Sequence, residues 1–469
     1  MNKEHEQTSI DLLIQNALVI PMDEDLPRVF KGDVAVNDGR IVSAAPSGHG
    51  NRFNARKRID ASGKICLPGF IDTHTHLFQV LLKGLGRDKP LLEWLDSSVR
   101  RAIKYITPEM IGAAASVGLL DALRSGTSTV VDYQYCHGMP GLDEAVIEEY
   151  RRLGVRGVLA RGYTNTAGFP EDVRPEMVER EEQFIEETES LARKYRGNDM
   201  MNIAAAPGII WDLTKQGFEA VRDLSERWGM TVTMHVMETP DDNQYAEEQL
   251  GMETMQFLDS IGLLTSRFHG VHGVYLSRND LRLSAERGIS IAHAPISNMI
   301  LASGNAPVRE MLELGIPVSL CCDGPASNDS QDMYEVIKAA SMVHKMVSGD
   351  ASAVPAYQVL KMATIDGARA VGMEKMIGSI TPGKRADIQL LDPRDVKSAP
   401  MHDPVHMIVY AGGRHLTDTL IIDGNVVMEQ GAIASADESL EIERVQEMAE
   451  LLVHKAGLAP GWKREMERA

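Results

Sequence analysis

Hydrophobic positions are spaced differently in the middle of the chain and at its two ends. Residues 10–66 alternate apolar and polar positions between frequent turn signals, and a period of two is typical of half-buried strands. The Asn37-Asp38-Gly39 turn separates two of these alternating runs, which predicts a hairpin. Short strand-like runs return after residue 375. We therefore expect both chain ends to contribute strands to one small β-unit.

The middle of the chain follows a second pattern. Short apolar runs alternate with longer stretches of helical period, such as 113–125 and 217–229, and several of these stretches end on a glycine, which is a helix stop signal. Eight β/α repeats predict a closed parallel barrel rather than an open doubly wound sheet, since no G-x-G-x-x-G motif follows the first strand. The apolar runs are 65–76, 127–133, 156–164, 202–210, 231–238, 268–276, 290–297 and 317–323.

The predicted fold class is therefore α/β, with a (β/α)8 TIM-like barrel inserted in a small β-sandwich that both chain ends form. We expect the first half of the sandwich at 1–66, the barrel at 67–372 and the second half at 373–435. The remaining residues, 436–469, are charged and helical in pattern. We expect this tail to pack against its own chain or against a second subunit.

The composition narrows the classes of partner. The chain has 469 residues, with 48 Lys and Arg against 67 Asp and Glu, so its net charge is −19 at pH 7. Such an acidic surface disfavours nucleic acids and anionic lipid surfaces. The polar, acidic first residues do not resemble a signal peptide, and no run of about 18 apolar residues is present. None of the cysteines has CxxC spacing, so we expect a reducing, cytoplasmic setting; they are Cys66, Cys136, Cys321 and Cys322.

The strongest candidate chemistry is the Asp72-Thr73-His74-Thr75-His76 segment at the end of the first barrel strand. Residues two apart on a strand face the same side, so both imidazoles point together, at the end of the barrel where active sites of this fold lie. An isolated pair of this kind is equally compatible with two packed strand histidines. The other strand ends favour chemistry, because they carry His235 and Glu238, His269 and His272, and Asp323.

Several imidazoles and one carboxylate at a single barrel mouth predict a site for one divalent metal ion. This set of side chains suits Zn²⁺, with Fe²⁺ as the alternative. A metal ion in such a site lowers the pKa of a bound water toward about 7. Glu238 follows His235 by three residues, so it is predicted to carry a proton between that water and the substrate. The alternative for Glu238 is a solvated loop carboxylate.

Weaker candidates follow the same strands. Gln79 lies just past the histidine pair, where it contacts a substrate or caps the following helix. His293 is on the seventh apolar run, where a buried structural role and a substrate contact are equally compatible with the sequence. Asn298 follows that run and is predicted to brace the loops or the metal-binding carboxylate, or to contact the substrate.

Longer segments resemble a known family. These segments are LPGFIDTHTHLFQVLLKGLG, DALRSGTSTVVD, HVMET, VHGVYLS, IAHAPISNMILASG, CCDGPASND and GSITPGKRADIQLLD. Together they resemble the amidohydrolase superfamily, specifically its hydrolytic deaminases and dechlorinases of heterocycles. The resemblance implies a homodimer or homotetramer and one metal ion, since the two-metal branch has a lysine on the fourth strand and 202–210 has none. It further implies metal ligands at His74, His76, His235 and Asp323, a polarising His272, and proton transfer by Glu238 and Asp323.

The substrate expected from the resemblance is a free N-heteroaromatic amine or a chloro- or aminotriazine. Nucleoside deaminases of this branch carry a ribose-binding glutamate after a Trp-Leu pair, here Trp94 and Leu95, but Ile103 occupies the corresponding position. They also carry a histidine where this chain has Gly208. Gln79 matches a glutamine that touches the heterocycle, and Trp94 is a further substrate candidate. Deamination of an adenosine-type nucleoside, and hydrolysis of a cyclic amide or urea C–N bond, remain the alternatives.

Overall fold

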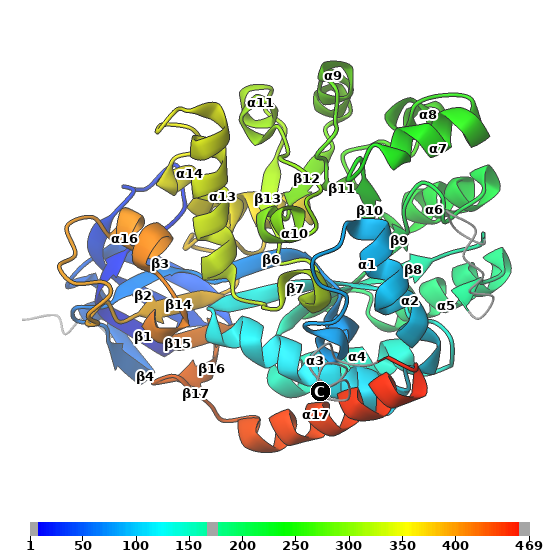
Figure 1. The fold of residues 1–469 in the computed structure, drawn as a ribbon. Helices are drawn as coiled ribbons and strands as arrows, with labels where there is room; N and C mark the ends of the chain where they lie inside the picture. The colour runs from blue at the N-terminus through cyan, green and yellow to red at the C-terminus, as the bar shows by residue number, and fades with distance from the viewer. Residues whose placement is uncertain (1–7, 167–176, 459–469) are drawn as a thin grey trace, which may run out of the picture.

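A barrel of parallel strands forms the centre of the molecule (Figure 1). The computed structural model describes residues 8–166 and 177–458. Eight strands pair in chain order, each parallel to the next, as the repeats predict. They are β6 (Phe70–Thr75), β7 (Thr127–Gln134), β8 (Arg156–Tyr163), β9 (Met201–Pro207), β10 (Val232–Val236), β11 (Phe268–His272), β12 (Ser290–His293) and β13 (Val318–Leu320).

The first and last strands of this sheet meet through a few polar contacts. The Thr73 hydroxyl donates to the Leu320 carbonyl at 3.0 Å, and the backbone N–H of Asp323 donates to the His74 carbonyl at 3.0 Å. The barrel is therefore nearly closed. This junction also brings residues that are about 250 positions apart in the sequence to the same carboxyl-terminal edge.

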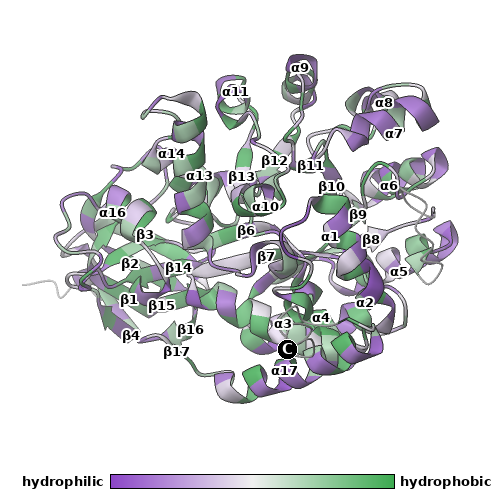
Figure 2. Cartoon of the chain, viewed as in Figure 1, coloured by the Kyte–Doolittle hydropathy of each residue, from purple (hydrophilic) through white to green (hydrophobic). Residues whose placement is uncertain are grey.

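Helices surround the barrel, and their ends follow local signals. Thr214 caps α6 by accepting from the Gly217 N–H, and Gly229 ends it with φ 65°. Figure 2 shows hydrophilic colour on outer helices such as α7 and α17, as expected for helices with one solvated face. The helices are α1 (Leu91–Ser97), α2 (Val99–Ala102), α3 (Pro108–Arg124), α4 (Leu142–Leu153), α5 (Glu181–Lys194), α6 (Lys215–Trp228), α7 (Asp241–Leu250), α8 (Thr254–Ser260), α9 (Arg278–Arg287), α10 (Pro295–Ile300), α11 (Val308–Glu313), α12 (Pro325–Asn328), α13 (Met333–Ser348), α14 (Ala356–Met362), α15 (Ile365–Ala370), α16 (Pro404–Ala411) and α17 (Glu438–Lys455).

Both chain ends form a second, mixed sheet of nine strands, which confirms the predicted insertion of the barrel into a small β-unit. The predicted hairpin is present: Asn37 pairs with Arg40, and Asp38 and Gly39 have φ 48° and 70°. The strands are β1 (Thr8–Val19), β2 (Phe30–Asn37), β3 (Arg40–Pro46), β4 (Phe53–Asp60), β5 (Ile65–Pro68), β14 (Ile388–Leu391), β15 (Thr417–Ile422), β16 (Asn425–Glu429) and β17 (Ala432–Ile433).

The apolar run at 65–76 corresponds to two strands rather than one. Its first half is β5, which pairs with β14 of the mixed sheet, and its second half is β6 of the barrel. Gly69 separates them, and a Cβ atom there would lie 2.4 Å from the Ser128 hydroxyl. The close approach of β7 therefore requires glycine at this point, where the chain passes from one sheet to the other.

Two contacts tie the outer parts to the barrel. Arg156 on β8 and Asp387 beside β14 form a buried, two-point ion pair at 2.7 and 2.8 Å. Helix α17 lies along α3 (Figure 1) and pairs Glu438 with Arg124, so the described part of the tail packs on its own chain. Residues 459–469 lie outside the described residues. Among the described helices, none has the length and apolar character needed to cross a bilayer.

Candidate active site

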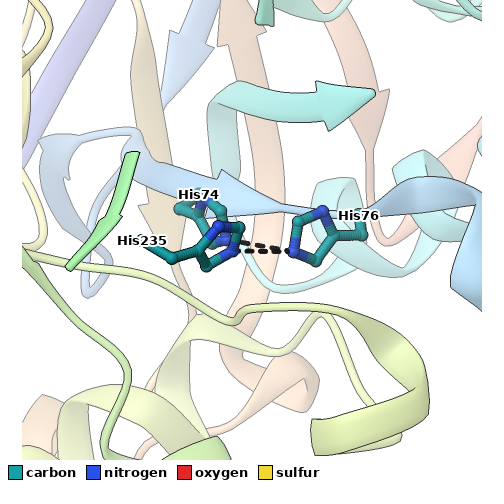
Figure 3. A group of neighbouring side chains, drawn as sticks. All are labelled: His74, His76 and His235. Carbon is teal, nitrogen blue, oxygen red and sulfur yellow. Dashed lines mark hydrogen bonds between the residues drawn. The ribbon is translucent and has the colours of Figure 1, made fainter. Parts of the chain in front are cut away.

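Three histidine side chains converge at the mouth of the barrel (Figure 3). His74 and His76 come from the end of β6, and His235 comes from β10. The Nε2 atom of His76 lies 3.2 Å from that of His74 and 3.3 Å from that of His235. Two nitrogen ligands of one tetrahedral zinc ion, each about 2.1 Å from it, are about 3.4 Å apart. The spacing of these three nitrogens therefore fits one shared metal ion.

Backbone carbonyls orient two of the imidazoles. The Nδ1 atom of His76 is 2.8 Å from the Tyr133 carbonyl, and that of His235 is 3.3 Å from the Gly208 carbonyl. A carbonyl only accepts, so each Nδ1 carries the proton and each Nε2 presents a lone pair. Two lone pairs that face each other at 3.3 Å repel unless a cation lies between them. This donor arrangement is the one that metal-binding histidines adopt.

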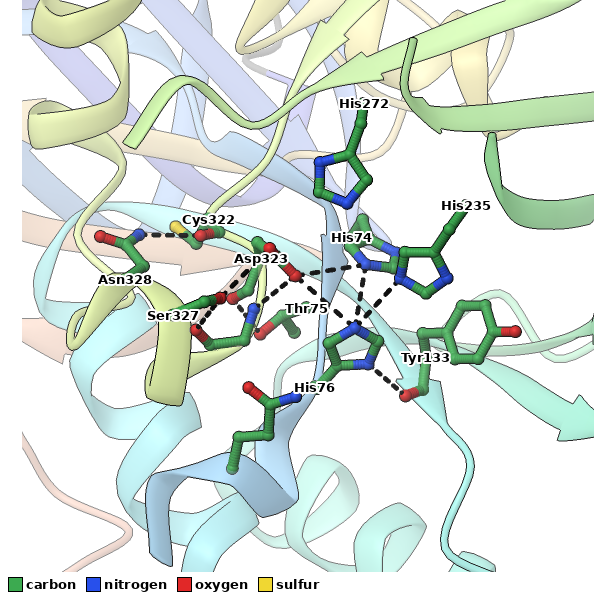
Figure 4. Close-up of polar contacts among 12 residues, drawn as sticks. His74, Thr75, His76, Tyr133, His235, His272, Cys322, Asp323, Ser327 and Asn328 are labelled. Carbon is green, nitrogen blue, oxygen red and sulfur yellow. Dashed lines mark hydrogen bonds and ion pairs between the residues drawn. The ribbon is translucent and has the colours of Figure 1, made fainter. Parts of the chain in front are cut away.

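Asp323 supplies a carboxylate to the same point (Figure 4). Its Oδ1 atom lies 3.5 Å from the Nε2 atoms of both His74 and His76. Its Oδ2 accepts a hydrogen bond from the Ser327 hydroxyl at 3.2 Å. The Thr75 hydroxyl donates to the Asp323 backbone carbonyl at 3.0 Å. These contacts fix the carboxylate beside the imidazoles, where it completes a possible set of four ligands.

Burial and the contacts within the cluster determine the protonation states of its side chains. Burial lowers the pKa of His74 to about 3 and also lowers the pKa of His76 and of His235. Burial alone would raise the pKa of Asp323, but the hydrogen bond with His74 and the positive charge of His272 hold it well below its usual range. Neutral imidazoles and an ionised carboxylate are the protonation states that bind a divalent cation.

Glu238 and His272 form a second pair beside this cluster. The Glu238 Oε2 atom is 3.4 Å from the His272 Nε2 atom, and Glu238 Oε1 accepts from the Ser303 hydroxyl at 3.0 Å. Burial raises the pKa of Glu238. Burial alone would lower the pKa of His272, but the Glu238 and Asp323 carboxylates outweigh it and raise that pKa. Raised pKa values on both groups favour the protonated form of each.

Two of these residues adopt the left-handed backbone conformation. His272 has φ 73° and Asp323 has φ 61°, which costs free energy for any residue other than glycine. His272 is the last residue of β11, and Asp323 lies three residues after the end of β13. Strained backbone of this kind is common at functional sites.

An aromatic cavity opens onto the cluster. It contains about 870 Å³ of space between atoms, its open mouth included. Aromatic and aliphatic side chains predominate in its walls, which suits a flat heteroaromatic ring. The lining residues are His76, Gln79, Leu91, Trp94, Leu95, Val99, Arg100, Tyr133, Tyr135, Tyr163, Thr164, Met177, Gly208, Ile209, Trp211, Asp212, His235, Glu238, His272, Leu301, Asp323 and Ser327.

The weaker sequence candidates separate into three groups. Gln79 and Trp94 line the cavity; the Trp94 indole N–H has no hydrogen-bond partner among the described residues. Asn298 does not line the cavity, but its Oδ1 lies 2.9 Å from His272 Nδ1. His293 is buried outside the cavity lining, with its Nε2 3.1 Å from His344 Nε2. Neither Asn298 nor His293 is among the residues that line the cavity.

Several residues of the site carry no sequence signal. Tyr133 fixes His76 through a backbone carbonyl, which any residue type supplies. Ser303 holds Glu238 from 65 positions away. Asp212 enters the cavity from the loop after β9, a segment the motifs do not cover. By contrast, His269 on β11, a candidate in the sequence, does not line the cavity. It is buried, and its Nδ1 atom lies 2.9 Å from the Ser290 hydroxyl.

Convergent side chains at the carboxyl ends of parallel barrel strands define the chain as a barrel enzyme with a hydrolase-type site. The chain belongs to the amidohydrolase family, whose model matches residues 65–427. It is 33% identical over 448 residues to a 5-methylthioadenosine/S-adenosylhomocysteine deaminase of Pelotomaculum thermopropionicum, covering 95% of this chain and 99% of that protein. It is also 33% identical to a 5'-deoxyadenosine deaminase of Methanosarcina mazei, covering 94% and 98%. The chain is accordingly a hydrolase that acts on C–N bonds.

Solved structures share the fold. An adenosine deaminase from Xanthomonas campestris with bound zinc superposes with a TM-score of 0.88 at 28% identity, covering 95% of this chain and 99% of that chain. Atrazine chlorohydrolase from Arthrobacter aurescens TC1, complexed with zinc, gives a TM-score of 0.87 at 24% identity, covering 93% and 100%. The second likeness concerns the fold alone. The predicted superfamily is thus confirmed.

Proposed function

We propose that this chain is a zinc-dependent aminohydrolase that replaces the amino group of an adenosine-type nucleoside by a hydroxyl. The observation that carries the proposal is the convergence of the His74, His76 and His235 Nε2 atoms beside the Glu238–His272 pair. Zinc suits three imidazoles and one carboxylate. When bound, the ion supplies a polarised water molecule of lowered pKa.

The chain's own residues provide the remaining steps. The aromatic cavity holds the purine ring and excludes bulk water. Glu238, whose pKa burial raises, donates a proton to the ring nitrogen next to the attacked carbon and recovers one from the new hydroxyl group as ammonia departs. Asp323 accepts the proton released by the attacking water and delivers it to the departing ammonia. His272 stabilises the negative charge that develops on the attacking oxygen.

The nucleoside class is supported by relatives that align with almost the whole chain and are named as deaminases of adenosine-type nucleosides. A free heteroaromatic amine or aminotriazine is the second candidate, and Ile103 favours it. This residue corresponds to the ribose-binding glutamate of the nucleoside branch, yet it is buried in an apolar cluster and does not line the cavity. Ribose therefore requires another partner in this chain.

Ammonia release tests the proposal. Purified zinc-loaded protein is given adenosine, 5'-deoxyadenosine, 5-methylthioadenosine, adenine, guanine and an aminotriazine, and ammonia is quantified with ultraviolet spectra. We expect the nucleosides to react fastest and Glu238→Gln to lower kcat about 10²- to 10⁴-fold, as for loss of a general acid. The surface variant Glu247→Gln serves as the control and should keep wild-type turnover. No ammonia from any of these compounds would contradict the proposal.

A further inference from the structure

The backbone that leads into Glu238 is strained and held on both sides. Met237, the first residue after β10, has φ 51°, a left-handed conformation that costs free energy for a residue other than glycine. Its carbonyl accepts from the Tyr275 N–H at 2.9 Å, and its N–H donates to the Asp242 carboxylate at 3.0 Å. These two contacts stabilise an unfavourable conformation directly before Glu238.

The same carboxylate also holds the backbone that follows Glu238. The Thr239 N–H donates to Asp242 Oδ2 at 3.2 Å, and the Met237 N–H donates to Asp242 Oδ1. Asp242 lies in the first turn of α7, yet it accepts from N–H groups that precede this helix, whereas a helix cap accepts from the first turn of the helix itself. One carboxylate therefore bridges the two peptide N–H groups that flank Glu238.

The carboxyl group of Glu238 has a separate support. Its Oε1 atom accepts from the Ser303 hydroxyl at 3.0 Å, and its Oε2 atom lies 3.4 Å from His272 Nε2. Ser303 lies beyond the end of α10, so different parts of the chain hold the backbone and the carboxyl group. A shift of the Glu238 backbone would move the carboxyl group away from contacts that do not move with it.

We propose that Asp242 is a positioning residue that fixes the backbone of Glu238 for proton transfer. The inference rests on the proposed function, in which Glu238 carries the proton. Asp242 is buried and does not line the cavity, so it acts through Glu238 and not on the substrate. Removal of its carboxylate leaves two N–H groups without their acceptor, which favours relaxation of the turn. Displacement of a reacting group by about 1 Å lowers a rate about 100-fold.

Kinetics of the zinc-loaded protein with its best nucleoside test this role. In Asp242→Ala we expect kcat to fall about 10- to 100-fold, while KM and bound zinc stay within about twofold of wild type. Asp242→Asn keeps one acceptor and should lose less activity. The control is Asp280→Ala, because Asp280 is also buried and accepts from the Ser277 N–H at the start of α9. This variant should keep the wild-type kcat.

A double variant separates positioning from a general loss of structure. Since a positioning residue acts only through the group it holds, adding Asp242→Ala to Glu238→Gln should lower kcat by no more than about twofold. An equal fall in kcat on adding Asp242→Ala to wild type and to Glu238→Gln would overturn the proposal.

Crystal structures of both Asp242 variants give a readout that needs no turnover, and Asp242→Asn supplies it where Asp242→Ala does not fold. We expect the Glu238 carboxyl group to lose its contact with Ser303, and Asp280→Ala to keep it. A Glu238 carboxyl group that stays in place, or wild-type kcat in the variants, would overturn the assignment and leave the aminohydrolase proposal intact. Absence of ammonia from every compound would instead contradict the proposed function, and the crystal structures would then decide the role of Asp242.

Discussion

The Nε2 atoms of His76 and His235 face each other at 3.3 Å, while the Nδ1 atom of each imidazole points at a backbone carbonyl. These two residues are 159 positions apart, on β6 and β10, so the barrel alone brings them together. The carbonyls of Tyr133 and Gly208 decide which nitrogen carries the proton. The peptide backbone thus presents two lone pairs at the point where the proposed metal ion would lie.

Asn298 is expected to act through His272 and not by touching substrate. Its Oδ1 accepts from His272 Nδ1 at 2.9 Å, which directs His272 Nε2 toward Glu238. Asn298→Ala should lower kcat about 10- to 100-fold, with metal content unchanged, and Asn298→Asp should retain more activity because it keeps an acceptor. Steady-state kinetics with the best nucleoside measure this effect. Wild-type kcat in Asn298→Ala would show that the contact is dispensable.

Breaking the buried Arg156–Asp387 pair should destabilise the joined sheets. Both side chains are almost inaccessible to water, at 0% and 2% exposure, so Asp387→Ala removes the two-point partner of a buried guanidinium and leaves it a longer contact with the Asp423 carboxylate at 3.7 Å. We expect a loss of about 3–5 kcal/mol in the free energy of unfolding, measured by urea denaturation. The exposed pair of Arg151 and Glu148 is the control, and Glu148→Gln should leave the midpoint almost unchanged. A wild-type midpoint in Asp387→Ala would refute this role.

Stability should depend on pH through Asp332. This residue caps α13 by accepting from the Tyr334 N–H at 2.9 Å, and burial raises its pKa to about 6. Between about pH 4 and pH 6 the native state then binds more protons than the unfolded state, so this group contributes less stability as pH rises.

The matched variant is Asp332→Asn, which keeps the cap and does not titrate. Relative to this variant, wild type should lose roughly 2 kcal/mol of unfolding free energy between pH 4.5 and pH 7, as measured by urea denaturation at both pH values with the metal content held constant. A difference that stays constant, or that grows in favour of wild type, would contradict the raised pKa of Asp332.

Local patterns predict most of this fold. Apolar runs, glycines that end helices and the Asn37-Asp38-Gly39 turn are local features of the sequence. The structure confirms the barrel and the sheet of the two chain ends that these features predict. The division of 65–76 into β5 and β6 is not local. It depends on the pairing of β5 with β14, more than 300 positions away, which periodicity does not encode.

The residues of the candidate site likewise include some that the sequence predicts and some that it does not. His74, His76, His235 and Asp323 are predictable because strand ends of a parallel barrel meet at one edge. Hydrogen-bond partners such as Ser303 leave no trace in the spacing of residues, because they come from loops whose paths the motifs do not define. Substrate recognition depends most on such loops, so it is the part that the sequence predicts least.

Metal content measured together with activity tests the central claim most directly. Wild type, His235→Ala and His344→Asn are expressed with ample zinc, and bound metal is counted by plasma mass spectrometry beside ammonia release. His344 is buried but outside the cluster, so its variant controls for loss of a buried imidazole. We predict one zinc ion per chain in wild type and His344→Asn, and loss of both metal and activity in folded His235→Ala. Full activity in metal-free wild type, or zinc retained by His235→Ala at wild-type affinity, would contradict the proposed site.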